Sequence, residues 1–387
     1  MKITALHIDI TNRCNLNCEY CFVTRRRKGL AHGNIKKFVK LIKGALEYGV
    51  KRISISGGEP LQHPGILELI RACSGGHVIL FSNLYGDQVN DQLISDILTT
   101  GQVQEIKVSL DGLVSHEKAR PPSKAKDVIK KIELVKKVAP QCHVTINTIL
   151  TKYNLPELRS FQETLVQMGI NHWRLDLPMK SPSTSVYASF REVITTVADI
   201  IKDRYENGHL QRMELTAFRV YKSSLENLAA DNMDDPGFDN AHPCAYAIGK
   251  MAVGVDGKVS ICSPLQLEIA RAWEYDDFLQ LVNVYSTHPF FLLRQGELGN
   301  CKRCRYYRLC GTGCRGEALE WMGKCDAIDP LSCSVMPLVE EKIVPILSSR
   351  LRTIYKSLIN EEGLDPEFVF PSQREMEESF TKSRKEV

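Results

Sequence analysis

Short apolar runs alternate with amphipathic stretches through the first half of the chain. The first run ends at Ile10, and the next covers residues 50–56. Between them, residues 34–49 place apolar side chains at helical spacing, and this pattern stops at Gly49. Strands that alternate with helices at this spacing predict βαβ units built on a parallel sheet. Further strands are predicted at 78–83, 106–112, 143–148 and 172–176, with helices at 124–137 and 156–168 between them.

Six of these strand–helix repeats fit within residues 1–180, fewer than the eight of a complete barrel. The predicted fold class is therefore α/β, a partial (β/α)6 barrel followed by a C-terminal cysteine-rich domain. In such barrels the carboxyl ends of the strands build the site, because they all face one mouth. The polar residues predicted at those ends are Cys14, Glu59, Asn83, Ser109, Asp111, Asn147 and Asp176.

Composition shifts divide the chain into four parts. The barrel is expected over residues 1–228, and its last part, from 187 onward, has a helical pattern. Residues 229–240 are acidic and rich in turn formers, which is typical of a linker. The cysteine-rich domain is then expected over 241–340, and a helix with a loose charged tail over 341–387.

Two local patterns shape the C-terminal part. Asp256 and Gly257 lie between β-rich residues and predict a hairpin, which would bring Cys244 and Cys262 near each other. An apolar period over residues 335–361 predicts one helix packed on the barrel.

Composition and charge exclude several classes of protein. The 387 residues are 43% hydrophobic and carry a net charge of +4, which is too small to indicate nucleic acid or a membrane surface as a partner. No apolar run approaches the ~18 residues of a membrane span. No signal peptide is recognised, and 13 residues precede Cys14, so a cytoplasmic protein is expected.

Thirteen cysteines are many for a reducing compartment, and clustered ones are best interpreted as metal ligands. Cys14, Cys18 and Cys21 follow the first predicted strand, where three thiolates could bind three irons of a cubic cluster and leave the fourth iron open. A structural zinc would need a fourth ligand, and none follows at finger spacing. A disulfide with a spare thiol is the other alternative. Cys73 and Cys142 stand alone and are expected in the core.

The C-x3-C-x2-C spacing, with Tyr20 just before the last cysteine, resembles the motif of radical S-adenosylmethionine (SAM) enzymes. The resemblance implies that SAM binds the open iron and is cleaved by one electron to methionine and a 5′-deoxyadenosyl radical, which removes a hydrogen atom from the substrate. It further implies that Tyr20 lies near the adenine, that Glu59 receives the amino group, and that Ser109 and Asp111 meet the ribose or carboxylate. Asp176 is a candidate acid or base. The candidate SAM contacts are Tyr20, Gly57, Gly58, Glu59, Ser82, Asn83, Ser109, Asp111 and Asn147.

The later cysteines follow C-x12-G-x4-C, then C-x2-C-x5-C-x3-C, then one more, which resembles the SPASM extension of some radical SAM enzymes. The resemblance implies an iron–sulfur domain with two auxiliary clusters, and thus three 4Fe–4S clusters in all. Lys250 stands where sulfatase maturases have another cysteine, so water or a substrate group is expected on the fourth iron of the inner cluster. Cys325 could replace Cys333 as the last ligand, but the longer gap favours Cys333. A pair of zinc sites is the alternative. The implied ligands are Cys301, Cys304, Cys310 and Cys333 for the outer cluster and Cys244, Cys262 and Cys314 for the inner one.

The functional hypothesis that follows from the resemblance is oxidative modification of a ribosomally made peptide, as a crosslink or an oxidation, with the auxiliary clusters accepting an electron. Oxidation of a small molecule or tetrapyrrole in cofactor biosynthesis is the alternative. A non-catalytic zinc or iron–sulfur binding module is a third hypothesis, from another class. The expected partners are a peptide or small-molecule substrate and an electron donor such as flavodoxin or ferredoxin. Because the barrel begins almost at residue 1, a separate peptide-recognition protein is a further candidate partner.

Overall fold

The computed structural model of the protein describes residues 1–22, 31–170, 172–178, 186–207, 214–217, 237–244, 248–265 and 267–363. The predicted linker at 229–240 lies outside these residues except for 237–240, and the predicted tail lies outside them from residue 364 onward. No helix among the described residues is long and apolar enough to cross a membrane.

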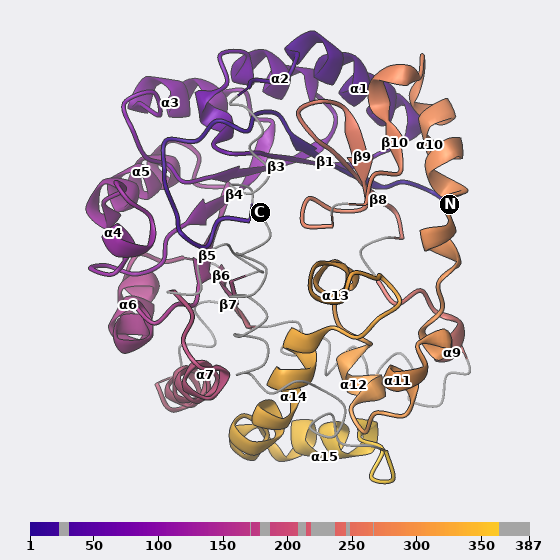
Figure 1. Ribbon diagram of the computed structural model, residues 1–387. Coiled ribbons are helices and arrows are strands. Elements are labelled where there is room, and N and C mark those ends of the chain that lie inside the picture. The colour runs from indigo at the N-terminus through magenta and orange to yellow at the C-terminus, as the bar shows by residue number, and fades with distance from the viewer. Residues whose placement is uncertain are drawn as a thin grey trace, which may run out of the picture.

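A ten-stranded sheet forms the wall of an open barrel (Figure 1). Its order is β10-β9-β8-β1-β2-β3-β4-β5-β6-β7, and all neighbours from β8 to β7 pair in parallel. The partial barrel predicted from the sequence is therefore confirmed. The strands are β1 (Ala5–Asp9), β2 (Arg52–Ser56), β3 (His77–Ser82), β4 (Val103–Ser109), β5 (His143–Ile149), β6 (His172–Asp176), β7 (Glu214–Ala217), β8 (Lys250–Val253), β9 (Lys258–Ser260) and β10 (Ala270–Arg271).

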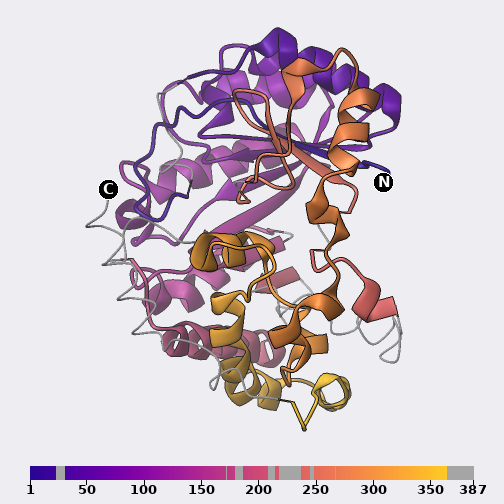
Figure 2. The ribbon, with the colours of Figure 1, turned by 45° about the vertical axis from the view of Figure 1, so that its right-hand side comes forward.

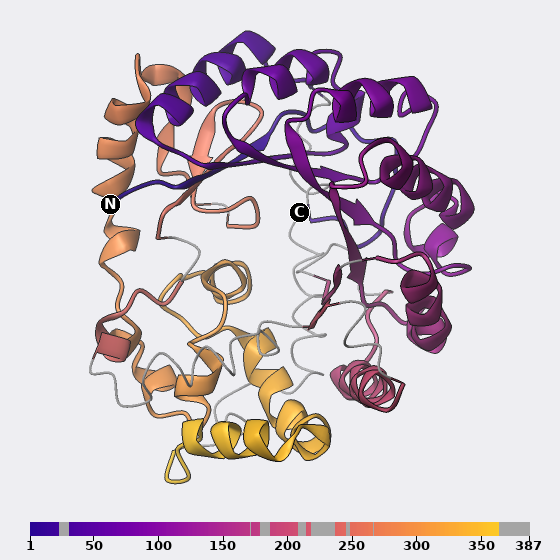
Figure 3. The same cartoon turned by 180° about the vertical axis from the view of Figure 1, so that it is seen from behind.

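Helices cover the outer face of this sheet, and the opposite side of the molecule is built from short C-terminal helices (Figures 1 and 3). The barrel helices begin and end as the sequence indicates. Asn34 caps the first helix by accepting from the Lys37 N–H (3.2 Å), and Gly49 ends it in a left-handed conformation. The barrel helices are α1 (Ile35–Tyr48), α2 (Ile66–Ala72), α3 (Asp91–Thr99), α4 (His116–Ala119), α5 (Ala125–Val138), α6 (Leu158–Gln167) and α7 (Phe190–Glu206), with the 3-10 turns η2 (Pro60–Gln62) and η3 (Leu155–Glu157).

The C-terminal half does not form a sheet of its own, because its strands extend that of the barrel. β8 pairs in parallel with β1, and the turn at Gly257 (φ 85°) joins it to the antiparallel strand β9. The hairpin predicted from the sequence is confirmed, and Figure 2 shows it running alongside β1. The helical prediction for 187–228 is wrong at Glu214–Ala217, which is β7, because four residues at a sheet edge carry too little periodicity to be recognised.

The predicted helix at 335–361 is also wrong in one respect, because it is two helices. α14 (Pro330–Lys342) packs on α7, where Arg191 pairs with Glu341 (2.8 Å), and it is followed by a 3-10 turn around Pro345. Proline lacks the N–H that would continue the helix. The other C-terminal elements are α9 (Gly237–Asn240), α10 (Phe278–Ser286), α11 (Gly299–Lys302), α12 (Tyr307–Cys310), α13 (Arg315–Met322) and α15 (Ser349–Leu358), with 3-10 turns η5 (Ala272–Glu274), η6 (Pro289–Leu292), η7 (Gln295–Glu297) and η8 (Val344–Ile346).

Candidate functional site

The cysteine loop, residues 14–21, follows the carboxyl end of β1. Its Cys21 N–H donates to the Cys18 carbonyl (3.1 Å), and Cys14, Cys18 and Cys21 are half-buried thiols that form no disulfide with the described cysteines. Burial raises the pKa of Cys18 to about 12, although the Arg120 guanidinium opposes the increase. Charge on Cys21 and Cys14 raises this pKa further. The three cysteines thus share one loop that follows β1, and binding of iron to them stays a prediction.

Tyr20, inside the cysteine loop, is anchored to a buried ion pair. Its hydroxyl donates to the Asp111 carboxylate, which also accepts from Arg120 Nε (2.9 Å) and Nη2 (3.2 Å) and from the Ile149 N–H (2.9 Å). The Arg120 guanidinium lies over the Tyr20 ring, 5.3 Å from its centroid. Both carboxylate oxygens of Asp111 are thus used to hold the cysteine loop against β4 and β5. Contact of Tyr20 or Asp111 with SAM stays a prediction.

Gly57 and Gly58 follow β2 and lie against the backbone that leads into the cysteine loop. Gly57 has a φ of 142°, and a Cβ on it would overlap the Thr11 carbonyl oxygen. A Cβ on Gly58 would overlap the Arg13 carbonyl oxygen. The Gly58 N–H donates to the Thr11 carbonyl (2.6 Å) and the Glu59 N–H to the Arg13 carbonyl (2.8 Å). The close approach expected of a ligand is therefore made here by the chain itself.

Glu59 is almost fully buried, yet both of its carboxylate oxygens accept hydrogen bonds. Oε1 accepts from the Leu61 N–H (3.0 Å) and the Ser82 hydroxyl (2.9 Å), and Oε2 accepts from the Asn83 N–H (2.7 Å). Burial raises the pKa of Glu59 to about 7, although these hydrogen bonds oppose the increase. The side chain links η2 to the end of β3, and its charge changes near neutral pH.

Asn83 ties the end of β3 directly to the cysteine loop. Its Nδ2 donates to Asn15 Oδ1 (2.8 Å) and lies 3.9 Å from Cys14 Sγ. Asn15 Nδ2 in turn donates to the Tyr85 carbonyl (2.5 Å). An amide donor beside the Cys14 sulfur stabilises its thiolate form, which is the form that binds a metal.

Ser109 and Asn147 are register neighbours at the ends of β4 and β5. In the part of the chain that the structure describes, Asn147 Oδ1 is buried and accepts no hydrogen bond. A buried acceptor left in this state costs about 1–3 kcal/mol, so its position indicates where a donor from a bound molecule belongs. This orphan oxygen fits the predicted SAM site.

Charged side chains line the same face of the sheet as Ser109 and Asn147. Asp176, at the end of β6, is half-buried and pairs with Arg174 Nε (2.7 Å). On β4, Lys107 Nζ lies 3.6 Å from the Glu105 carboxylate. Burial lowers the pKa of Lys107, charge on Glu105 raises it, and charge on Arg174 lowers it. The barrel interior therefore offers opposed charges to a polar substrate, and the acid or base role of Asp176 stays a prediction.

A second group of thiols, Cys301, Cys304, Cys310 and Cys333, lies on the C-terminal helices. Burial raises the pKa of Cys310 to about 12, and charge on Asp329, Cys301 and Cys304 raises it further. Burial also raises the pKa of Cys333, with charge on Cys310 as the next cause. The four thiols are therefore mutual neighbours.

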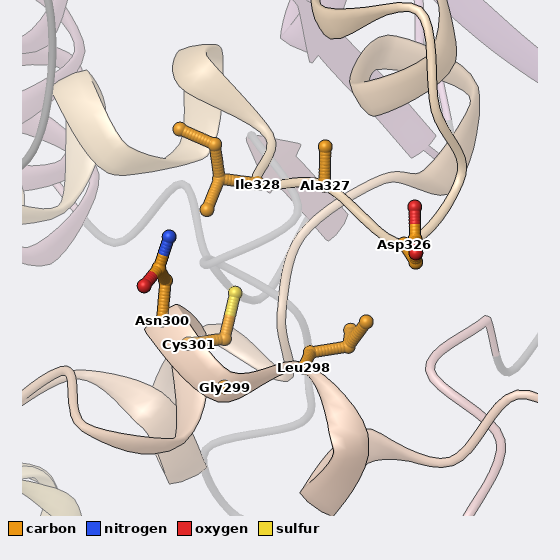
Figure 4. A pocket seen from close by; sticks show the side chains of 7 residues that line it. All are labelled: Leu298, Gly299, Asn300, Cys301, Asp326, Ala327 and Ile328. Carbon is orange, nitrogen blue, oxygen red and sulfur yellow. The ribbon is translucent and has the colours of Figure 1, made fainter.

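A pocket of about 230 Å³ opens beside this second group. Figure 4 shows the Cys301 sulfur directed toward the segment of Ala327 and Ile328, across the pocket from the start of α11. The pocket gives solvent-sized molecules access to Cys301.

The third group begins with Cys244 and Cys262, on either side of β8 and β9. Burial lowers the pKa of Lys250 to about 8, and charge on both thiols opposes that decrease. Burial also raises the pKa of Tyr285, with the same two thiols as further causes. Cys244 and Cys262 thus share two neighbours, as the predicted hairpin implies.

Cys314 belongs to this third group by position. It precedes α13, and its sulfur lies 3.4 Å from where a Cβ on Gly316 would be. Leu265, three residues after Cys262, faces the same spot on α13 at 3.7 Å. The hairpin end and the start of α13 therefore meet where Cys314 lies.

Thiolates in groups are ligands for iron–sulfur clusters and for zinc alike. Among the described residues, no group of three or more His, Cys, Asp or Glu side chains is arranged to hold a metal ion. An iron–sulfur cube spreads its thiolate ligands over separate irons, so its sulfurs lie further apart than the ligands of one zinc ion. Assignment of each thiol to a cluster stays a prediction.

Two groups that hold the site carried no recognisable sequence signal. Arg120 is separated from the cysteine loop by about a hundred residues, and nothing in its neighbourhood marks it as a partner of Asp111. Glu157 accepts from the N–H groups of Leu113, Val114 and Ser115 (each 3.0 Å) and so fixes the loop after β4. Both act through tertiary contacts, which periodicity does not encode.

Comparison with known proteins finds relatives that align with most of the chain. The Radical SAM superfamily model matches residues 8–165. The AdoMet-dependent heme synthase of Oleidesulfovibrio alaskensis is 24% identical over 343 residues, which cover 85% of this chain and 86% of that protein. The PqqA peptide cyclase of Methylorubrum populi is 22% identical over 346 residues, covering 85% of this chain and 84% of that protein.

Solved structures share the fold over most of the chain. Native anSMEcpe with bound AdoMet and Cp18Cys peptide superposes with a TM-score of 0.68 at 17% identity, covering 92% of this chain and 99% of that one. SuiB of Streptococcus suis bound to S-adenosylmethionine gives a TM-score of 0.63 at 16% identity, covering 84% of this chain and 76% of that one. At these identities the likeness describes the fold.

Proposed function

This chain carries a radical SAM domain over residues 8–165 and is an SAM-dependent enzyme, and we propose that it oxidatively modifies a ribosomally made peptide. The observation that most supports a peptide substrate is its alignment with PqqA peptide cyclase over 85% of the chain. The SPASM-type neighbours include structures with a bound peptide, among them SuiB with precursor peptide SuiA. The alignment with a heme synthase over 85% of the chain supports the second candidate, oxidation of a tetrapyrrole or other small molecule.

The structure suits this chemistry at the cysteine loop. Cys14, Cys18 and Cys21 would hold a four-iron cluster, which would supply the electron for reductive cleavage of SAM. The protein positions that loop through Asp111 and the glycines after β2. Asn147 Oδ1 offers an acceptor for a hydroxyl or amino group of SAM.

The substrate side of the barrel is polar and open. The described strands end at β10 and β7, which do not pair with each other, so the sheet does not close into a complete barrel. We infer that the substrate binds at the inner face of the sheet, where it would meet the opposed charges of Lys107, Glu105, Arg174 and Asp176. We assign the two C-terminal thiol groups to auxiliary clusters that take up the second electron of a two-electron oxidation.

The test is anaerobic assay of the iron-loaded protein with SAM and dithionite, with 5′-deoxyadenosine as the measured product. Activity is expected, and Cys14→Ala should abolish it, whereas Cys142→Ala should leave it unchanged. Persistence of SAM cleavage in Cys14→Ala would refute the site. Coexpression with short peptides encoded beside the gene, read by mass spectrometry, should reveal a product that has lost two hydrogen atoms; a modified tetrapyrrole instead would favour the second candidate.

A further inference from the structure

His7, Asp9 and Ser263 form a hydrogen-bonded group on the first strand of the barrel. His7 Nε2 lies 3.1 Å from Asp9 Oδ1, and the Ser263 hydroxyl donates to Asp9 Oδ2 (2.7 Å). A carboxylate accepts hydrogen bonds and donates none, so the neutral His7 ring carries its hydrogen on Nε2. The Nδ1 atom of His7 then keeps a lone pair that can take up a proton.

We propose that His7 is the base that takes a proton from the substrate during its oxidation, and that Asp9 positions the ring. This inference rests on the proposed function, because it assumes that a substrate is oxidised inside the barrel. Asp176, the other candidate base, is a carboxylate that pairs with Arg174 (2.7 Å). Near neutral pH an imidazole is a stronger base than a carboxylate, so His7 is better suited to the transfer.

Alternation along β1 places His7 on the inner face of the sheet. Its neighbours Leu6 and Ile8 are 1% and 0% exposed and belong to the hydrophobic core. The His7 and Asp9 side chains are 26% and 23% exposed. Successive side chains of a strand point to opposite faces, and the helices cover the outer face (Figure 1). His7 and Asp9 therefore point into the barrel.

Side-chain contacts connect His7 with the charged groups on the same face. The rings of His7 and Phe81 meet edge to face, with their centroids 5.9 Å apart. Lys107 Nζ lies 5.5 Å from the centroid of the Phe81 ring. On β2, between these strands, the residue paired with His7 is Ser54, whose small side chain leaves His7 room to reach Phe81. Only one aromatic ring thus separates His7 from Lys107, where we infer that the substrate binds.

The same group joins the approach to the cysteine loop to the third group of thiols. Asp9 is the last residue of β1 and stands five residues before Cys14, whereas Ser263 directly follows Cys262. The hydrogen bond between Asp9 and Ser263 therefore links the two segments. A base at this place lies between the predicted SAM site, which takes the hydrogen atom, and the thiols assigned to an auxiliary cluster, which takes the electron.

The proposed oxidation removes two hydrogen atoms from the substrate in three parts. A substrate C–H bond breaks, and its hydrogen atom forms a C–H bond at C5′ of the adenosyl group derived from SAM. The substrate carbon then gives one electron to an auxiliary cluster. His7 Nδ1 takes a proton from a neighbouring substrate atom, and the electron pair of that bond forms the double bond or the crosslink. The Asp9 carboxylate stabilises the imidazolium that results.

The test uses the anaerobic holoprotein with SAM, dithionite and a synthetic copy of the short peptide encoded beside the gene. The measured quantity is the ratio of modified peptide to 5′-deoxyadenosine. In His7→Gln the amide can still donate to Asp9 but is no base, so this ratio should fall about 100-fold. In His7→Ala, added imidazole should restore part of the ratio. The matched control is His77→Gln, which changes an exposed histidine at the amino end of β3 and should keep the ratio of the parent.

Two results would overturn this inference and leave the proposed function standing. One is a ratio in His7→Gln that equals the ratio in His77→Gln. The other is a failure of imidazole to restore any of the ratio in His7→Ala, which would give His7 a purely structural role. Absence of modified peptide with the parent protein would overturn the proposed function and, with it, this inference.

A measurement without substitution guards against misfolding of the variants. Holoprotein is treated with diethyl pyrocarbonate, which modifies accessible neutral histidines, in the presence and absence of the same peptide. Each histidine is then followed by peptide mass spectrometry. His7 should be modified in the free protein and protected by the peptide. His288, which follows α10 on the outer side of α1, should react equally in both samples. Equal modification of His7 in the two samples contradicts the proposal.

Discussion

Removal of the Arg120 side chain should weaken the anchor of the cysteine loop. The Asp111 carboxylate is 0% exposed and the Arg120 side chain 10% exposed, and two hydrogen bonds join them. In Arg120→Met the carboxylate stays buried with only the Tyr20 hydroxyl and the Ile149 N–H as donors. Breaking one side of such a pair costs about 3–5 kcal/mol, because an uncompensated charge remains in the interior.

The expected change in melting temperature follows from the length of the chain. At about 2.1 cal/mol/K per residue, unfolding of 387 residues gains roughly 0.8 kcal/mol/K, so Tm should fall by about 4–6 °C. The matched control is Lys202→Met, which breaks an exposed pair with Glu206 (3.8 Å). That pair is worth less than about 0.5 kcal/mol, and its loss should move Tm by less than about 1 °C. Calorimetry of both variants, prepared anaerobically, gives the comparison.

A double variant separates the charge from the packing. Adding Asp111→Asn to Arg120→Met removes the buried charge while the amide oxygen still accepts a hydrogen bond. Part of the lost stability should return, on the order of 1–3 kcal/mol. If the double variant is instead less stable by the sum of the two single losses, the charge argument is wrong. If Arg120→Met melts within 1 °C of the parent, the pair does not anchor the loop.

Three further predictions concern single side chains. Glu59 loses its proton near pH 4.5 when unfolded and near pH 7 when folded, so the folded state binds more protons between these values. The free energy of unfolding of the protein should therefore fall by roughly 3 kcal/mol as pH rises across that window. Denaturation curves of Glu59→Gln should lack this dependence of stability on pH. Gly58→Ala should destabilise the protein by more than about 2 kcal/mol and lower iron retention at the cysteine loop, because the added Cβ would overlap backbone atoms. The control is Gly49→Ala, where the added Cβ meets open space but the backbone is left-handed. This substitution should cost about 1 kcal/mol. Equal costs for the two alanines would remove the steric argument. Arg315→Lys should lower the free energy of unfolding by about 2–4 kcal/mol, since an ammonium does not hold three carbonyls in one plane. An unchanged urea unfolding curve would contradict this prediction.

The sequence alone determined the features that depend on neighbours along the chain. Strand and helix periods, the stop at Gly49, the hairpin at Gly257 and the cysteine spacing on the first loop are all local. A period of two or 3.6 residues and a turn residue express local backbone preferences, so they can be read without knowing the fold. They sufficed to predict an open α/β barrel with thiols at the mouth.

Only the tertiary structure decided which distant groups meet. Asp111 faces Arg120 and Tyr20, Asn83 reaches the cysteine loop, and β7 completes the wall of the barrel. These pairings depend on how the strands and loops pack in three dimensions, and the contact of Tyr20 with Asp111, 91 positions away, leaves no periodic trace in the chain.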